Sequence, residues 1–365
     1  MESSFKEVSV LIKRTTPLCY LPSGVLVCYK DGYIILLDNG KQIKRFLLFD
    51  SMKERIIGRF RYAFRFLRLG IRAAVALDEN NIIISKGNTI FEVNLKEETI
   101  SNGFYCGDGI RPLIFTESKG VKGIQDGVYF GGYLGNRNKK PVHIYKRTAK
   151  DRWEVVYTFP QGDINHVHTI VADKYRECLW IFTGDFGKAA AIWRASSDFK
   201  VVERFVCNDQ KYRGCVAYAI PEGLLYATDA PFADNFIFLL DINTKVAKPL
   251  GELPGSCIYG CKWNDNYVFS STVEPDGRNT TKWQALFGRK RGSGIKDDYV
   301  HVICGNLQHG FKEIFKCKKD GLPYCSFQFG VIRFPYGICT TQSLCFQPVS
   351  TVRDDLNTLI LECNK

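Results

Sequence analysis

Residues 18–49 read LCYLPSGVLVCYKDGYIILLDNGKQIKRFLLF, four short apolar runs divided by Pro-Ser-Gly, Asp-Gly and Asn-Gly. Each run has the length and the β-branched or aromatic content of a strand. Asp-Gly and Asn-Gly are the pairs that favour tight hairpin turns. The stretch therefore predicts four antiparallel strands that follow one another in one small sheet.

The same grouping of short strands recurs along the whole chain. Further sets span residues 71–104, 110–159, 166–206, 212–251 and 256–317. A last set has three runs (325–332, 336–343 and 357–364), and residues 5–12, FKEVSVLI, can supply its fourth strand. Seven sets in 365 residues give about 52 residues each, the size of propeller blades. We predict an all-β fold, a single β-propeller domain over residues 1–365 with seven blades, closed by the amino-terminal strand; six blades is the alternative.

Composition agrees with this fold and narrows the class of partner. Aromatic residues make up 13% of the chain, which favours pleated sheets. The net charge of +12 suits an anionic partner. Without an apolar run of about 20 residues or a secretory signal, we expect a cytoplasmic protein. In that compartment the 14 cysteines are expected to be free thiols that pack as small hydrophobes.

One segment departs from the strand pattern. Residues 51–70, SMKERIIGRFRYAFRFLRLG, have helical periodicity and form an insertion between the first and second blades. The apolar face would carry Ile56, Phe60, Phe64 and Leu67, and the rest of the surface Arg55, Arg59, Arg65 and Arg68. Two interpretations stay open: a helix that packs on the propeller, or a peripheral contact with anionic membrane through these four arginines.

Polar residues recur where the first strand of a blade begins and its second strand ends. In a propeller these two places meet on one face, around the central opening. The beginnings carry Arg72, Arg111, His166 and Arg213, and the ends carry Tyr133, Asp185, Asp229 and Thr272. The sequence therefore predicts one mouth lined by three guanidiniums, two carboxylates and an imidazole.

Several arginines at one opening form a receptor for a carboxylate or phosphate, because the guanidinium binds planar oxyanions in bidentate fashion. Asp185 and Asp229 could then be acid/base groups, hydroxyl-binding groups, or counter-charges for the arginines. The alternative is that Arg–Asp pairs simply tie neighbouring blades together and bind no ligand.

His166 and His168 lie one residue apart in a predicted strand, so both side chains point to the same face. A metal site needs a third ligand, such as Asp185. We expect instead that no metal or other cofactor is bound, that His166 is a proton-transfer candidate together with Asp185 and Asp229, and that His168 is a ligand-binding candidate beside Arg72, Arg111, Tyr133 and Arg213.

The segments HVHTIVADKYRECLWIFTGD (166–185), QKYRGCVAYAIPEGLLYATDAP (210–231) and IRPLIF with GVYFGGY (110–133) resemble a group of sialidase-like propellers encoded among bacterial surface-polysaccharide genes. The resemblance covers most of residues 70–245. It implies an arginine triad on a substrate carboxylate, which Arg72, Arg111 and Arg213 could supply. Asp-box turns are degenerate, since TAKDRW (148–153) and SSDFKV (196–201) lack the glycine, and no Tyr–Glu nucleophile pair is assigned.

These observations lead to two hypotheses. The first is a propeller that binds an acidic glycan or glycan precursor at its mouth in surface-polysaccharide metabolism. Whether it also cleaves the glycan, as a glycoside hydrolase or polysaccharide lyase, stays open. The second is a non-catalytic scaffold that docks pathway enzymes at the membrane through the arginine-rich segment. A nucleic-acid partner is not expected, because basic stripes with exposed aromatic residues are missing from the sequence.

Overall fold

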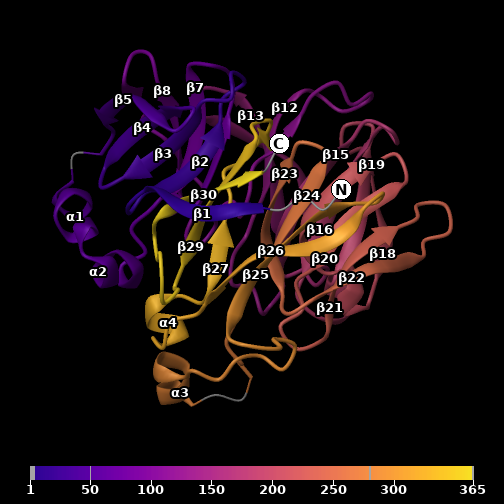
Figure 1. The fold of residues 1–365 in the computed structure, drawn as a ribbon. Helices are drawn as coiled ribbons and strands as arrows, with labels where there is room; N and C mark the ends of the chain where they lie inside the picture. Colours follow the sequence, from indigo (N-terminus) through magenta and orange to yellow (C-terminus); the bar gives the residue numbers. More distant parts are fainter. Residues whose placement is uncertain (1–4, 50, 279–280, 364–365) are drawn as a thin grey trace.

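The computed structural model describes residues 5–49, 51–278 and 281–363, and its strands form seven sheets around a central axis (Figure 1). The first sheet holds the four strands predicted from residues 18–49: β2 (Thr16–Tyr20), β3 (Leu26–Lys30), β4 (Tyr33–Asp38) and β5 (Lys41–Leu47). Each strand pairs with the next in antiparallel register. The prediction of a seven-bladed β-propeller is confirmed.

The second to fourth sheets follow in chain order. The second holds β6 (Ala73–Ala76), β7 (Asn81–Lys86) and β8 (Thr89–Asn94), with β9 (Thr99–Ile100) and β10 (Phe104–Tyr105) both paired to β8. The third holds β11 (Thr116–Ser118), β12 (Gly127–Gly131), β13 (Val142–Ala149) and β14 (Arg152–Phe159). The fourth holds β15 (His166–Asp173), β16 (Cys178–Gly184), β17 (Ala191–Ser196) and β18 (Val201–Cys207).

The last three sheets complete the ring. The fifth holds β19 (Gly214–Ile220), β20 (Gly223–Thr228), β21 (Asn235–Leu240) and β22 (Ala247–Leu253). The sixth holds β23 (Cys257–Trp263), β24 (Asn266–Ser271), β25 (Tyr299–Asn306) and β26 (Gly310–Lys318). The seventh joins β27 (Val331–Arg333), β29 (Ser343–Val349) and β30 (Thr358–Cys363) to β1 (Phe5–Ile12), so the two ends of the chain share one blade.

Burial explains why the sequence folds this way. Every residue of β16 is buried, because a strand inside a blade is covered on both faces by the neighbouring blades. In the outer strand β5 only Phe46 is buried, and the other residues, including Ile43 and Leu47, lie at the surface or partly so. Apolar runs therefore lie toward the middle of each blade, and mixed runs lie at the outer edge.

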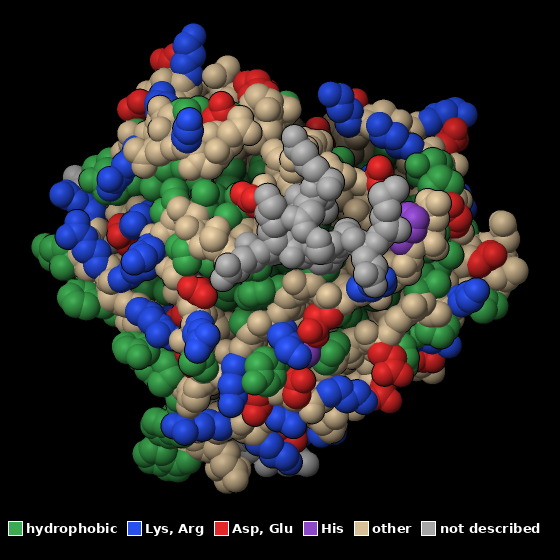
Figure 2. Space-filling view, in the orientation of Figure 1, with side chains coloured by type: hydrophobic (Ala, Val, Ile, Leu, Met, Phe, Trp, Pro, Cys, Tyr) green, Lys and Arg blue, Asp and Glu red, His purple; other side chains and the backbone are tan. Residues whose placement is uncertain are grey.

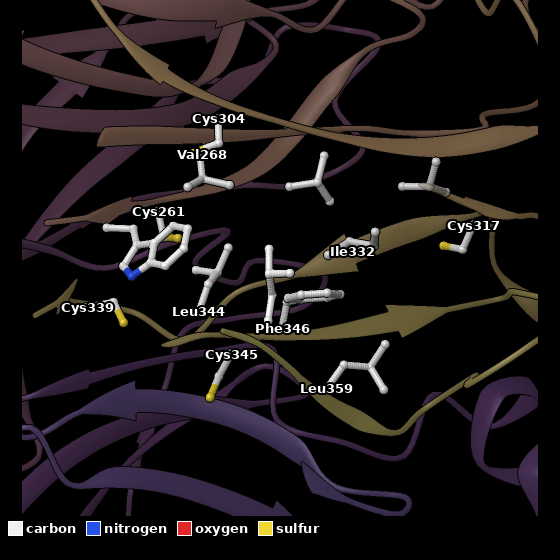
Figure 3. Packing of buried hydrophobic residues seen from close by; sticks show 14 of the residues in the cluster. Cys261, Val268, Cys304, Cys317, Ile332, Cys339, Leu344, Cys345, Phe346 and Leu359 are labelled. Atoms are coloured by element: carbon white, nitrogen blue, oxygen red, sulfur yellow. The ribbon is translucent and has the colours of Figure 1, made fainter. Parts of the chain in front are cut away.

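The cysteines pack as predicted. The thirteen whose side chains the structure describes form no disulfide, and eleven of them are buried. Figure 3 shows Cys261, Cys304, Cys317 and Cys345 among the leucine, valine and phenylalanine side chains between the sixth and seventh blades. These sulfur atoms fill core space that a larger apolar side chain would overfill.

Three strand assignments from the sequence are wrong. In the seventh blade the second strand is β29, because residues 336–343 run past the sixth blade, where β28 (Ile338–Cys339) pairs in parallel with β23. Residues 325–327 belong to the helical turn α4 (Tyr324–Phe327). The third blade begins with β11 at residue 116 rather than at residue 110, and Arg111 makes only an isolated bridge to Tyr133.

The insertion between β5 and β6 contains three short helices, α1 (Met52–Arg55), η1 (Ile57–Arg59) and α2 (Arg61–Phe66). Its expected apolar face is turned outward, since Ile56, Phe60 and Leu67 are exposed. Arg65, by contrast, is fully buried. Its guanidinium donates to the carbonyl of Phe327 and to the carboxylates of Asp320 and Asp355, so it is unavailable to a membrane and that part of the prediction is wrong.

A fourth helix, α3 (Lys282–Phe287), lies in the sixth blade between β24 and β25. It begins with a capping box, in which Thr281 and Gln284 exchange side-chain and backbone hydrogen bonds. Within the described ranges, none of the helices has the length and apolar content that a membrane span requires.

Replacing Arg65 by Ala should lower the free energy of unfolding by about 3 kcal/mol, because Asp320 and Asp355 would lose their buried cation and keep only the more exposed Arg61, and Lys319 for Asp320, as partners. Arg59→Ala, at an exposed position of the same insertion, should change it by no more than about 0.5 kcal/mol. Urea unfolding of both variants measures the difference. Equal, small effects would show that the Arg65 cluster does not anchor the insertion.

Candidate functional site

A central channel of about 700 Å³ follows the axis of the ring. It is lined by the innermost strands of the seven blades, from Thr16 and Pro17 in the first blade to Arg333 and Phe334 in the seventh. The beginnings of the inner strands lie at one end of this channel, and of the residues predicted there Arg72 is part of its lining. We call this end the mouth.

Three arginines approach one another at the mouth. Arg72 and Arg333 line the channel. Arg111 is close enough for its charge to act on Arg72. Burial, together with the positive charges of Arg111 and Arg333, lowers the pKa of the Arg72 guanidinium. In the described part of the chain these three guanidiniums have no carboxylate partner, and the Nε atom of each is buried without a hydrogen bond.

Aromatic rings, rather than acids, lie beside these arginines. The guanidinium of Arg72 lies 5.3 Å from the ring centre of Tyr133, and that of Arg333 lies 5.9 Å from the ring centre of Tyr259. Cation–π contacts of this kind hold a guanidinium in place without neutralising its charge. We call Arg72, Arg111 and Arg333 the arginine cluster.

Arg213 behaves differently from the other predicted arginines. Its Nη2 lies 3.3 Å from Oδ1 of Asp185 and 3.2 Å from Oδ2 of Asp229. Asp229 also accepts a hydrogen bond from the thiol of Cys215 and is itself buried. In this part of the mouth the Arg–Asp pairs hold blades together, which is the alternative given in the sequence analysis. Asp229 is a buried counter-charge that a ligand in the channel would not reach.

His166, His168 and Asp185 form a compact cluster next to Arg213. The two Nε2 atoms are 3.0 Å apart, and Oδ1 of Asp185 lies 3.2 Å from Nε2 of His166 and 3.7 Å from Nε2 of His168. The Tyr133 ring centre is 4.4 Å from that of His166. Tyr133 therefore connects the arginine cluster to this group, which we call the His–Asp cluster.

Local structure explains how the strands bring these side chains together. A β-bulge in β15 places His168 as an extra residue between Val167 and Thr169. Gly184 of β16 pairs with His166, and a Cβ atom on it would lie 2.5 Å from the His168 ring, so glycine is required there. The carbonyl of Leu134 accepts a hydrogen bond from Nδ1 of His166, and the side chain of Asn165 accepts one from the backbone of Asp185.

The charge states follow from these contacts. Burial lowers the pKa of His168, which favours its neutral form. Although burial by itself would raise the pKa of Asp185, the two imidazoles and the charge of Arg213 hold it well below its usual range. Asp185 is therefore an ionised carboxylate at the open side of the cluster, with 29% of its side chain exposed.

The structure adds residues that sequence reasoning missed. Arg333 lies at the end of β27 within the apolar run GVIRFPYG, where no strand beginning marked it. Glu274 follows the predicted mouth residue Thr272 by two positions and accepts a hydrogen bond from its hydroxyl at 2.6 Å. Loss of water contact and the nearby charge of Asp229 raise the pKa of Glu274 to about 7.

The fold and this mouth define a β-propeller in which a cluster of arginines without acidic partners lies beside the His–Asp cluster.

No family model matches the chain, and no curated protein matches it in sequence. Solved structures are similar in fold. One is described as "Oligogalacturonate lyase in complex with manganese": the TM-score is 0.58 at 10% identity, over 100% of this chain and 97% of that chain.

Two further structures are similar over almost their whole length. The AfRom2 CNH domain gives a TM-score of 0.56 at 9% identity, over 98% of this chain and 99% of that one. The Cps50 (Swd1) β-propeller domain of Myceliophteria thermophila gives 0.55 at 8% identity, over 99% and 100%. At these identities the similarity establishes the propeller fold alone.

The raised pKa of Glu274 gives a pH-dependent stability. With a folded pKa near 7 and an ordinary value of 4.5, the native state binds the proton more tightly, so this group destabilises the fold as the pH rises from about 4.5 through 7. Glu274→Gln mimics the protonated form. Its stability relative to wild type should increase by about 1 kcal/mol or more between pH 5 and pH 8.

Urea unfolding at both pH values tests this expectation. Glu222→Gln, at an exposed position outside the mouth, serves as the matched control and should show no such increase. A difference for Glu274→Gln that is constant with pH would contradict the raised pKa.

Proposed function

We propose that the protein binds an acidic sugar or glycan precursor at the mouth, with the sugar carboxylate held by Arg72, Arg111 and Arg333. The observation that carries this proposal is the lack of any acidic partner for these three guanidiniums within the described residues. A site that only ties blades together would pair its arginines with carboxylates, as Arg213 does with Asp185 and Asp229.

The energetics favour an anionic ligand. Buried like charges without a counter-charge destabilise a fold, and a bound carboxylate would relieve that repulsion while it fills bidentate donors. The channel volume of about 700 Å³ lies in the range of small-ligand sites. Tyr259 lines the channel as well and offers a ring that a sugar can contact.

Two likenesses point to the same class of ligand. The resemblance of residues 70–245 to sialidase-like propellers implies recognition of a carboxylated sugar. One of the structures of similar fold is that of an oligogalacturonate lyase, whose name refers to an acidic oligosaccharide. At 10% identity this second likeness carries the fold only, so the proposal depends on the arginine cluster.

Glycan cleavage is the finer form of this proposal. The ionised carboxylate of Asp185 and the imidazole of His166 lie 3.2 Å apart, and Tyr133 lies between His166 and Arg72 of the arginine cluster. They are the groups that could move a proton during hydrolysis or elimination. Incubation with oligogalacturonates, followed by assays for new reducing ends and for unsaturated products, distinguishes the two reactions from binding alone.

The binding proposal predicts a charge-dependent loss of affinity. Arg111→Ala and Arg333→Ala should each weaken the binding of trigalacturonate by about ten- to a hundredfold, because a charge-assisted hydrogen-bond partner is lost. Calorimetric titration measures the dissociation constants. Arg353→Ala, at an exposed position in the seventh blade, is the matched control and should bind like wild type.

The methyl ester of trigalacturonate provides a second control, since it keeps the sugar rings and removes the negative charges. It should bind weakly to the wild-type protein and be insensitive to the arginine substitutions. Equal affinities for acid and ester, or unchanged binding in both arginine variants, would refute a carboxylate receptor at the mouth.

A second candidate function is docking on an anionic membrane, favoured by an exposed apolar surface. Tyr62 and Phe66 contact Phe327 at the end of α4, which lies next to α3, so the insertion and α3 share one side of the molecule (Figures 1 and 2). We call this the apolar edge; its exposed members are Met52, Ile56, Phe60, Tyr62, Phe66, Leu67, Trp283, Leu286 and Phe287.

Basic residues surround the apolar edge in Figure 2. Arg55, Arg59 and Arg68 are exposed there, as are Arg289 and Lys290 after α3. Large apolar side chains framed by cations fit the boundary between lipid headgroups and acyl chains, where apolar burial and attraction to anionic lipid act together. This differs from the sequence-based hypothesis of one amphipathic helix, because Arg65 is buried and α3 of the sixth blade adds to the surface.

Vesicle flotation tests this second function. The protein should float with vesicles that contain phosphatidylglycerol, and Phe60→Ser combined with Trp283→Ser should weaken partitioning by at least about tenfold, because two inserted aromatic rings are lost. Val155→Ser combined with Tyr175→Ser, at exposed positions on other blades, should have no effect. Absence of wild-type flotation at low salt would exclude membrane docking.

A further inference from the structure

The His–Asp cluster brings three lone pairs to one point. Nδ1 of His166 donates to the carbonyl of Leu134 at 2.9 Å, which leaves its Nε2 as an acceptor in the neutral ring. That Nε2 faces Nε2 of His168 and Oδ1 of Asp185. Two imidazole lone pairs and a carboxylate oxygen repel one another, so either a proton on Nε2 of His168 or a metal ion must lie between them.

The geometry points to a divalent first-row transition-metal ion bound by His166 Nε2, His168 Nε2 and Asp185 Oδ1. Ligand atoms about 2.1 Å from one ion are about 3.0 Å apart at a right angle and about 3.4 Å apart at the tetrahedral angle. The three separations here are 3.0, 3.2 and 3.7 Å. Two imidazoles and one carboxylate on one side of an ion leave its remaining positions open.

The surroundings match those of a metal centre. Metal-binding imidazoles usually donate their second N–H to a carbonyl or carboxylate, which fixes the ring. His166 does so through Leu134. Nδ1 of His168 is buried without a hydrogen bond, 3.9 Å from Oδ2 of Asp229. With a metal on Nε2, this Nδ1 carries the proton and points it toward that carboxylate.

The ion would be open to solvent on one side only. Both histidines are buried, and the partly exposed Asp185 marks the open side. A second group of possible ligands, His168, Cys215 and Asp229, shares one imidazole but uses its Nδ1 and is entirely buried. We assign the ion to the first group, because only there can it enter from the mouth and keep exchangeable positions.

Titration of the untagged, chelator-treated full chain with Co²⁺ tests this site. The visible absorption of bound Co²⁺ should saturate at one equivalent and lack a sulfur-to-cobalt band. Asp185→Asn and His166→Gln should weaken binding by at least about tenfold. His143→Gln, which removes an imidazole outside the mouth that contacts Thr158, and Cys215→Ala should leave it unchanged.

Each outcome of the titration supports or overturns the metal assignment. No saturable Co²⁺ binding by the wild-type chain would mean that a proton alone occupies the centre of the cluster and would overturn the assignment. Binding that persists in Asp185→Asn and His166→Gln, or that is lost in Cys215→Ala, would place the ion elsewhere and would also overturn it. Thermal unfolding of each variant shows that it is folded. Arg111→Ala should retain the metal, so this test is independent of glycan binding.

Discussion

The backbone pairing of β1 with β30 is the contact on which the rest of the structure depends. It joins residues 5–12 to residues 358–363 and turns seven sheets in a row into a closed ring. Closure packs the faces of the first and seventh blades against each other and fixes the radius at which the innermost strands lie. Without the β1–β30 pairing, Arg72 in the second blade and Arg333 in the seventh would not be held in the lining of one channel.

The closed ring brings several arginines to the mouth, and the two halves of the mouth differ in how the charge of these arginines is balanced. Around Arg213 the protein places Asp185 and Asp229, so charge is balanced internally. Around Arg72 it places Arg111, Arg333 and aromatic rings, so positive charge is left uncompensated. The first solution stabilises the ring. The second costs stability, and such a cost is typical of positions that interact with a ligand.

The sequence predicted the blades well because each one repeats a local pattern of short apolar runs and Gly-containing turns. Strand direction alternates in a fixed way within a blade, and the structure brings His166, Asp185 and Arg213 together, whereas Arg72 contacts Tyr133 beside them. It missed Arg333, because the short strand β27 and the parallel strand β28 depend on contacts with other blades rather than on their own residues. It misjudged Arg65, whose partners Asp320 and Asp355 lie more than 250 residues away.

Tyr133 connects the two halves of the mouth. Its ring contacts the guanidinium of Arg72 on one side and the imidazole of His166 on the other. On the proposed function, a carboxylate held at the arginine cluster directs the rest of its sugar ring along Tyr133 toward the His–Asp cluster. A cation in that cluster would then lie opposite the anchored carboxylate, at a distance set by one aromatic ring. The residues that bind the carboxylate, the ring beside them and the residues that would carry out any chemistry thus come from three different blades. Each blade is held rigid by its own sheet.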